Sequence, residues 1–326
     1  MKKIIIVTSK GKGGGHIALA LLCKLLIERG YDAKVYYVHD FPDQNVDPRW
    51  FWRRCLKVSV NRCLEKLGLP RLFRRIPSLD FYSPDCDYSP LGNLPEKIFP
   101  FFNKKKTIVV YPEVVYGNFL RAKNVVRWLL FKNRYKDMEG AFGKDDLVIC
   151  YRQFFNDWDL NPEGYQVRLA HFDSSMYRQY NFEPRSGNCY LIRKGRTRTD
   201  LPAEFDGPVI DYSMWEKDIV DIFNTCKYCY LYDTQTFYAK IAAVCGCIPI
   251  VVMEPGKSRE DYMGETDTRI PGVAYGDSKE EIMYAVTTRN ELLESLDYTK
   301  MNEESIDIFI KAVKEKFKLD IYGLKY

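Results

Sequence analysis

The chain has 326 residues, of which 46% are hydrophobic and 29% are charged, a composition that excludes a disordered or fibrous protein and fits two domains. No stretch approaches the ~20 apolar residues that cross a bilayer, and the run after Met1-Lys2-Lys3 is too short for a secretion signal, so we expect a cytoplasmic protein. The net charge of +5 conceals an asymmetry, because residues 1–150 hold 27 Lys and Arg against 15 Asp and Glu, whereas residues 151–326 hold 22 against 29. We therefore expect the two halves to have different partners.

The first half begins with a strand, a glycine loop and a helix. Residues 3–8 are a β-branched apolar run, the next seven residues include four glycines, and apolar residues recur at helical spacing between Ile17 and Leu26. With a second strand at 33–38, this pattern predicts a βαβ unit in a parallel sheet. Further elements are predicted as strands at 107–111, 147–151 and 167–172, a basic helix near 122–131, and a long loop over 76–104.

Strands and helices also alternate from Gly187 onward. The predicted strands are 189–193, 208–211, 228–232, 248–253 and 272–275, and the predicted helices are 214–225, 236–245, 279–295 and 303–317. This alternation in both halves predicts an α/β protein of two facing Rossmann-like, doubly wound domains with a cleft between them. We expect the first domain to span 1–185 and the second 186–302, with a C-terminal helix in 303–326 that crosses back to the first domain.

The glycine loop is the first candidate site. Gly14 and Gly15 precede His16 at the start of the predicted helix, where glycine lets a ligand approach the backbone and free amides favour anions. His16 can remove a proton near neutral pH. The alternatives are a loop that only turns the chain and an imidazole that packs on the helix start. The loop does not match the dinucleotide fingerprint, so we do not expect a nicotinamide cofactor.

Two further candidates follow strands of the second half. Arg193 and Lys194 come after a predicted strand and could neutralise a diphosphate, although a solvated basic turn is the alternative. The segment Tyr232-Asp233-Thr234-Gln235-Thr236 opens the next helix. Asp233 or Thr234 could cap that helix, and with Tyr232 and Thr236 they could contact a phosphate or a sugar.

This second segment resembles a known family. The helix after Asp233 is rich in small residues and ends at Cys245-Gly246-Cys247, and the strand Ile248-Pro249-Ile250-Val251-Val252 follows. The order resembles the donor-binding segment of glycosyltransferases with the two-Rossmann GT-B fold. Aligned on Gly246, the first glutamate of the family's Glu-x7-Glu motif falls on Asp233 and the second on Ile241. The resemblance thus implies that the carboxylate of Asp233 binds the donor sugar. It also implies that Ile241 stands where the family has the carboxylate expected to hold the nucleotide ribose.

Other segments are similar to the same fold. Arg193 and Lys194 fall where these enzymes hold the donor diphosphate. The run Gly13–Ala20 is similar to the Gly-Gly-His segment of the lipid-linked N-acetylglucosaminyltransferase of peptidoglycan synthesis, and Tyr111–Asn118 resembles a segment of bacterial polysaccharide glycosyltransferases.

The resemblance implies a hexosyltransferase-type, metal-independent enzyme of bacterial surface polysaccharide synthesis, for example of capsule or O-antigen. It would use a nucleotide-diphosphate sugar as co-substrate, a saccharide or lipid-linked acceptor, and no cofactor. His16 or Glu113 would be the base if the reaction inverts configuration, and the departing phosphate could take the proton if it retains. A nucleotide-sugar epimerase on the same fold, or a non-catalytic member of a polysaccharide-assembly complex, are the alternatives.

Possible metal ligands are few. The spacing of Cys226, Cys229, Cys245 and Cys247 falls near a zinc pattern, but these residues belong to a predicted strand and helix, so we expect buried free thiols. The segment Asp85-Cys86-Asp87 has the spacing of an Asp-x-Asp metal-binding motif, but it lies in a predicted irregular loop. We therefore expect no metal site.

Two basic, aromatic stretches stand out in the first half. Arg49–Arg75 holds nine Lys and Arg with one acid, and Arg121–Lys136 holds six with none. Cations interleaved with Trp and Leu suit an anionic membrane surface, with an ordinary solvated face as the alternative. No nucleic-acid-binding module is recognised, so a nucleic-acid partner is not expected. We expect a peripheral protein on the inner face of the cell membrane.

Overall fold

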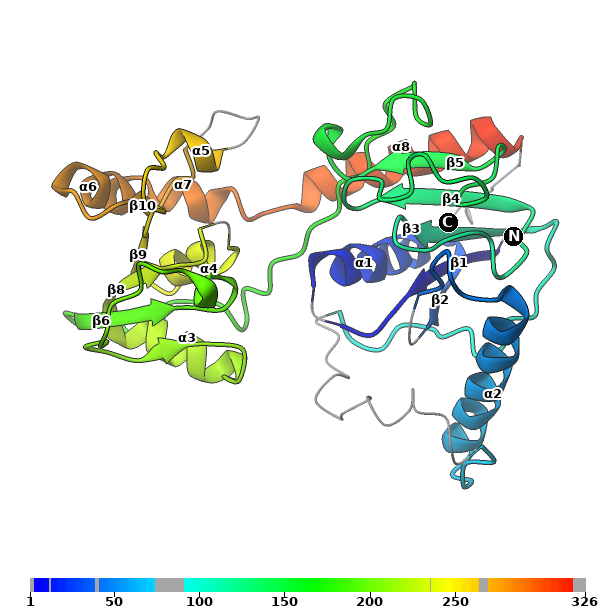
Figure 1. The fold of residues 1–326 in the computed structure, drawn as a ribbon, viewed down its shortest axis with the longest axis horizontal. Helices are drawn as coiled ribbons and strands as arrows, with labels where there is room; N and C mark the ends of the chain where they lie inside the picture. Colours follow the sequence, from blue (N-terminus) through cyan, green and yellow to red (C-terminus); the bar gives the residue numbers. More distant parts are fainter. Residues whose placement is uncertain are drawn as a thin grey trace. The chain divides into compact units, whose positions relative to one another are not determined.

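The computed structural model describes residues 3–11, 13–38, 41–73, 91–234, 236–263 and 269–318, and the motif Asp85-Cys86-Asp87 lies outside them. The chain forms two compact units (Figure 1). Unit 1 runs up to His171 and includes the C-terminal segment from Tyr298, and unit 2 is Phe172–Asp297. Each unit contains a five-stranded parallel sheet, which confirms an α/β fold of two Rossmann-like, doubly wound domains.

The sheet of unit 1 has the strand order β2-β1-β3-β4-β5. Its strands are β1 (Lys3–Thr8), β2 (Asp32–Tyr37), β3 (Thr107–Pro112), β4 (Asn124–Leu129) and β5 (Leu147–Cys150). All residues of β3, β4 and β5 are buried, as expected of parallel strands covered on both faces. The strand order reverses between β1 and β3, and ligands of such sheets bind beyond the carboxyl ends of the strands at this switch.

Helices and loops cover both faces of this sheet. The helical elements of unit 1 include α1 (Gly14–Glu28), α2 (Pro48–Lys66), the 3-10 turn η3 (Gln153–Phe155) and α8 (Thr299–Phe317). Apolar residues of α1 and α8 pack with Ile4 and Ile6 on one face. Phe51 of α2 and Phe119 pack with Ile5 on the other face. The C-terminal helix is therefore part of the core of unit 1.

Unit 2 repeats the topology of unit 1. Its strands β6 (Ser186–Leu191), β7 (Val209–Ile210), β8 (Cys226–Leu231), β9 (Ile248–Val251) and β10 (Ala274–Tyr275) have the order β10-β9-β8-β6-β7. If the strands of each unit are numbered 1 to 5 in chain order, both sheets have the strand order 2-1-3-4-5. Unit 2 therefore has its own switch in strand order, between β6 and β8.

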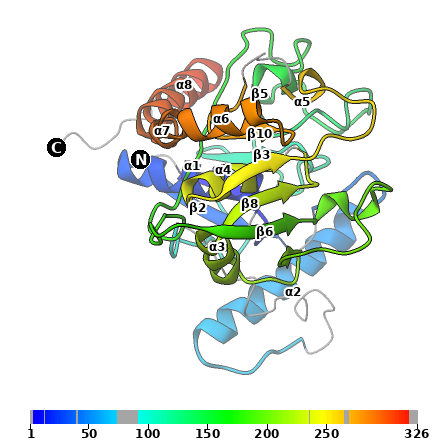
Figure 2. The same cartoon turned by 90° about the vertical axis from the view of Figure 1, so that its left-hand side faces the viewer.

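The helical elements of unit 2 are η4 (Lys194–Thr197), α3 (Glu216–Thr225), α4 (Tyr238–Val244), α5 (Glu260–Met263), α6 (Lys279–Thr287) and α7 (Arg289–Glu294). The helices α3 and α6 cover opposite faces of the sheet (Figure 2). None of the helices in the described part of the chain is long and apolar enough to span a bilayer.

The basic helix predicted near 122–131 is wrong, because this segment forms β4, in which Arg127 and Trp128 are completely buried. The buried guanidinium of Arg127 is satisfied by an ion pair with Asp146 at 2.8 Å and by the carbonyl oxygens of Val115 and Gly117 at 3.0 and 2.7 Å. A cation thus occupies a central strand because a carboxylate and two carbonyl oxygens surround it. The correction also removes Arg121–Lys136 as a continuous interfacial stretch.

The strand predicted at 167–172 is also absent. Val167 and Leu169 are buried in the core, yet the backbone of Arg168 and Ala170 bonds to side chains of α8 rather than to a neighbouring strand. The alternating apolar residues of this segment are therefore buried against the helix α8, and they do not form a strand. The units divide at 171/172 rather than at the expected 185/186, because residues 172, 176 and 177 pack on the core of unit 2.

Candidate functional site

A cavity of about 530 Å³ lies where β1 and β3 of unit 1 end. Its size is within the range of small-molecule sites, and its position is the switch point of the sheet. The cavity is lined by Gly13, Gly15, His16, Leu19, Phe41, Asp43, Pro112, Glu113, Val114, Leu130, Phe131, Arg134 and Tyr135. The two proposed bases, His16 and Glu113, therefore line the same cavity although they are 97 positions apart in the sequence.

His16 lies in the first turn of α1, with its imidazole against the glycine loop. A Cβ atom added to Gly11 would lie only 2.9 Å from the ring, so a larger residue there would displace it. The Nε2 atom is 2.9 Å from the Ser9 hydroxyl oxygen, and Nδ1 is buried with no hydrogen-bond partner among the described residues. Burial lowers the pKa of His16, so the imidazole is neutral at physiological pH.

Glu113 follows the last residue of β3 and is 6% exposed. Its Oε2 atom accepts a hydrogen bond from the backbone N–H of Leu130 at 3.0 Å, which fixes the carboxyl group beside the end of β4. Burial raises the pKa of Glu113 above its usual range, which brings its proton exchange nearer to neutral pH. Arg127 positions this segment through the carbonyl oxygens of Val115 and Gly117.

In unit 2, Asp233 organises the loop at the switch between β6 and β8. It is 5% exposed, and its Oδ1 atom accepts hydrogen bonds from the backbone N–H groups of Arg193 and Gly195 at 3.0 and 2.7 Å. A Cβ atom at Gly195 would lie 2.4 Å from the carbonyl oxygen of Tyr232, so only glycine allows the loop to approach β8 this closely. Asp233 therefore holds a loop at the end of the neighbouring strand and does not cap α4.

Arg193 lies between two aromatic rings. Its guanidinium carbon is 4.6 Å from the ring centre of Tyr212 and 4.8 Å from that of Tyr238. Its Nε atom is buried without a hydrogen-bond partner, and within the described ranges no carboxylate forms an ion pair with this side chain. Lys194, the next residue, is exposed. The loop thus presents one cation oriented between aromatic rings, with Asp211 near enough to interact electrostatically, and one exposed cation, a combination that suits phosphate groups.

The remaining predicted donor residues have other surroundings. Tyr232 is 8% exposed, and the guanidinium of Arg198 lies 5.1 Å from its ring centre. Thr236 accepts a hydrogen bond from the backbone N–H of Tyr238 at 3.3 Å, and Thr234 is half-buried. Gly14 begins α1 in unit 1, with open space where its Cβ atom would be.

The predicted site residues thus form two groups. Gly15, His16 and Glu113 line the cavity of unit 1, and Arg193, Lys194 and Asp233 share the loop of unit 2. Ser9, Tyr212 and Tyr238 were not predicted as site residues from the sequence. Ser9 follows β1 directly, a position that could have identified it, whereas the two tyrosines contact Arg193 only through the tertiary fold.

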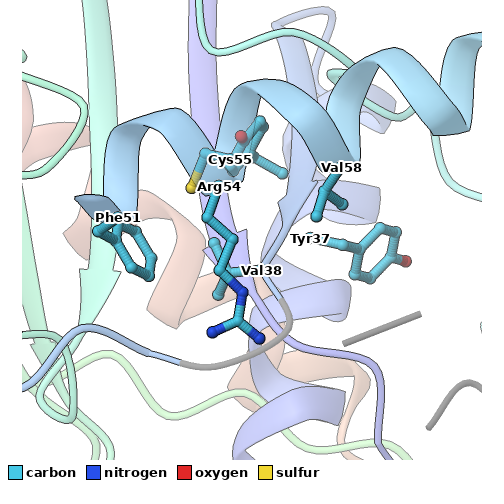
Figure 3. A pocket seen from close by; sticks show the side chains of 7 residues that line it. Tyr37, Val38, Phe51, Arg54, Cys55 and Val58 are labelled. Atoms are coloured by element: carbon cyan, nitrogen blue, oxygen red, sulfur yellow. The ribbon is translucent and has the colours of Figure 1, made fainter. Parts of the chain in front are cut away.

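Two other features offer little room for a ligand. Across the part of the chain that the structure describes, no group of three or more His, Cys, Asp and Glu side chains is arranged to hold a metal ion. Cys226, Cys229, Cys245 and Cys247 are buried free thiols. A small cavity between α2 and β2 has about 20 Å³, room for about one water molecule (Figure 3).

No protein-family model and no curated protein matches this chain. Among solved structures, a glycosyltransferase from Rickettsia africae is 7% identical, with a TM-score of 0.48 and coverage of 97% of this chain and 99% of that one. A glycosyltransferase of avilamycin A biosynthesis is 9% identical over 98% of both chains, with a TM-score of 0.44. A protein described as a UDP-N-acetylglucosamine 2-epimerase from Listeria monocytogenes is 9% identical over 99% of both chains, with a TM-score of 0.37. Because each of these TM-scores is below 0.5, the function is inferred from the geometry of the two sites.

Proposed function

We propose that the protein is a glycosyltransferase that moves a sugar from a nucleotide-diphosphate donor to a saccharide or lipid-linked acceptor in bacterial surface polysaccharide synthesis. The observation that carries the proposal is the loop of unit 2, where Asp233 orders the backbone around an Arg193 that lies between two aromatic rings and forms no ion pair within the described residues. An anionic ligand is the complement of such a cation.

The donor diphosphate binds to Arg193 and Lys194. Breaking the glycosidic bond leaves negative charge on the departing phosphate, and these two cations stabilise that charge. The aromatic rings of Tyr212 and Tyr238 keep the Arg193 guanidinium in place before the donor arrives. The scheme needs no metal ion and no cofactor besides the nucleotide sugar.

The acceptor binds in the cavity of unit 1. In an inverting reaction, Glu113 or His16 removes the proton of the acceptor hydroxyl as its oxygen attacks the anomeric carbon. The raised pKa of Glu113 favours this role, since the ionised carboxylate is then a stronger base than an exposed one. The lowered pKa of His16 keeps its imidazole unprotonated for the same purpose. In a retaining reaction the departing phosphate takes the proton instead.

Thermal unfolding with a panel of nucleoside diphosphates tests the donor site. A ligand that binds only the folded state raises the unfolding temperature, and at 100 times its Kd it adds about 2.7 kcal/mol. Lys194→Ala is expected to reduce this stabilisation, whereas Lys217→Ala, at an exposed position of α3, leaves it unchanged. If no nucleoside diphosphate stabilises the protein, the donor site is refuted. Epimerised sugar formed from the donor alone would identify an epimerase.

We also propose that unit 1 docks on an anionic membrane through α2 and the turn after it. The helix holds six Lys and Arg against one Glu, and Leu67, Leu69 and Leu72 in the following turn are 67%, 50% and 66% exposed. In Figure 1 this end of α2 projects away from the sheet of unit 1. Exposed leucines beside cations suit insertion at the headgroup boundary, and the protein would be peripheral on the cytoplasmic face.

A further inference from the structure

Exposed aromatic and basic side chains gather on the loops that follow β4 and β5 in unit 1. We name this surface the shelf, and its members are the exposed residues Phe131, Lys132, Arg152, Phe154 and Trp158 together with the half-buried Phe155. Phe131 is 59% exposed, Phe154 47% and Trp158 59%. Large apolar rings that remain this exposed in one place mark a binding surface.

The rings of the shelf are held in fixed positions. The ring centres of Phe131 and Phe155 are 5.0 Å apart, and those of Phe154 and Phe155 are 5.7 Å apart. The ring of Trp158 packs beside Gly164, where an added Cβ atom would lie 3.2 Å from it. The exposed rings are therefore ordered before any ligand binds.

The two loops that carry the shelf are also joined to each other. Asn133, in the loop after β4, donates a hydrogen bond from Nδ2 to Asp157 Oδ2 at 3.0 Å in the loop after β5. Asn161 ties the second loop together through hydrogen bonds with Asn156 and Tyr165. A preformed surface loses little conformational entropy when it binds a ligand.

Lys132, Arg134 and Arg152 are exposed cations of this region, and Arg134 interacts electrostatically with the carboxylate of Glu113. The ammonium group of Lys132 lies 4.2 Å from the ring centre of Phe154. Within the described ranges Lys132, Arg134 and Arg152 form no ion pair, while the neighbouring Asp159 is paired with Lys136 at 3.5 Å. An anionic group on the ligand would offset this charge.

The shelf continues into the cavity that contains Glu113, because Phe131 and Arg134 line that cavity. A ligand lying on the aromatic rings can thus extend one of its hydroxyl groups toward the proposed base. Aromatic faces stack on the C–H faces of pyranose rings, and adjacent cations select carboxylate or phosphate groups.

We propose that the shelf binds the acceptor as an acidic saccharide, a pyranose carrying a carboxylate or a phosphate. This inference rests on the proposed glycosyl transfer and specifies the acceptor. Lys132 and Arg152 pair with the anionic group, Phe154 and Trp158 support the sugar ring, and Arg134 guides the acceptor to the cavity.

Binding of defined saccharides to the full chain, measured by calorimetry and saturation-transfer NMR, tests the proposal. A hyaluronan tetrasaccharide supplies the carboxylate and is compared with neutral chitotetraose. N-acetylglucosamine 1-phosphate supplies the phosphate and is compared with N-acetylglucosamine. We expect one acidic saccharide to bind at least 10-fold more tightly than its neutral counterpart.

Three variants locate the effect. Lys132→Gln/Arg152→Gln should remove the preference for the acidic saccharide, whereas Lys123→Gln/Lys144→Gln, which loses the same charge at exposed positions elsewhere in unit 1, should keep it. Phe154→Ala should weaken the binding of acidic and neutral saccharides to the same extent.

Equal binding of acidic and neutral saccharides, or a preference that survives in Lys132→Gln/Arg152→Gln, would overturn the proposal. The same holds if this variant loses binding to phosphatidylglycerol vesicles while saccharide binding is unaffected, since the shelf would then be a membrane contact. Nucleoside diphosphates are added to the same protein in parallel. If they stabilise it while the acidic saccharides fail, the shelf is refuted and the donor site stands.

Discussion

The carboxylate of Asp233 accepts a hydrogen bond from the backbone N–H of Gly195 at 2.7 Å and so joins the ends of β8 and β6. These strands are neighbours in the sheet although Asp233 and Gly195 are 38 residues apart. The same oxygen accepts a bond from the N–H of Arg193. Under the proposed function, Asp233 therefore acts on the donor through the loop that it orders, and not by direct contact with the donor sugar.

Replacing Asp233 by Ala is expected to lower both stability and nucleoside diphosphate affinity. Two backbone N–H groups lose their acceptor, which costs about 1–3 kcal/mol for each group left buried and unsatisfied. Asp233→Asn keeps an oxygen acceptor and should retain most of both properties. Denaturant unfolding and diphosphate titration of the two variants provide the measurement. If Asp233→Asn unfolds like the parent yet loses donor sugar affinity, the carboxylate contacts the sugar directly.

Glu113→Gln is expected to reduce the transfer rate by about 100-fold or more, the usual contribution of a general base. The activity of the parent should rise with pH through the raised pKa of Glu113, since only the ionised carboxylate accepts a proton. This rise should be absent in Glu113→Gln. Initial rates between pH 4 and 9 test the role, and an unchanged rate and profile would exclude it.

The same substitution is expected to stabilise the fold at neutral and higher pH. Burial raises the pKa of Glu113 in the folded state, so ionisation of the carboxyl group opposes folding above that pKa. The advantage of Glu113→Gln should therefore decrease as the pH falls and lose its ionisation component below the unfolded pKa of about 4.3. Urea unfolding at several pH values measures it. Glu139→Gln, at an exposed position of the same unit, should show no such trend.

Much of the fold could be predicted from the local spacing of apolar residues and glycines in the sequence. The apolar run of β1, the glycine loop and the helical spacing of α1 agree with one another, and the structure forms the βαβ unit they predict. The pattern failed at β4, because Arg127 suggested an exposed helix and only the folded chain brings Asp146 to its guanidinium. It also failed after residue 166, because an alternating apolar segment packs equally well on a helix.

The candidate sites could be predicted in part for a similar reason. His16 and Glu113 each follow a strand, and parallel strands end at the same edge, so both were expected near a switch point. The sequence could not indicate that Tyr212 and Tyr238 hold Arg193, because these residues meet only when β7 and α4 are in place. Nor could it distinguish a helix cap at Asp233 from a bond to the next strand.

Ser9→Ala is expected to lower kcat by roughly 10-fold, the effect of losing an orienting hydrogen bond worth about 1 kcal/mol or slightly more. The Ser9 hydroxyl lies 2.9 Å from Nε2 of His16 and fixes the orientation of the imidazole beside the cavity. Ser9→Thr keeps the hydroxyl group and should restore the rate. Steady-state kinetics should show the change in kcat with little change in KM for the donor, and equal rates for both variants would contradict an orienting role.

Leu69→Glu/Leu72→Glu is expected to reduce binding to phosphatidylglycerol vesicles. These exposed leucines follow α2, and burying them at the headgroup boundary stabilises the bound state, whereas new carboxylates are repelled by the anionic lipid. Arg53→Gln/Lys57→Gln should weaken binding as well, since each cation near the surface contributes about 1 kcal/mol, or roughly 5-fold in affinity. Vesicle flotation at low and high salt measures both effects. Met283→Glu, a control at an exposed position of α6 in unit 2, should float like the parent. Parent protein that fails to float at low salt would exclude membrane docking through α2, and flotation unaffected by the leucine substitutions would exclude the turn as the inserted element.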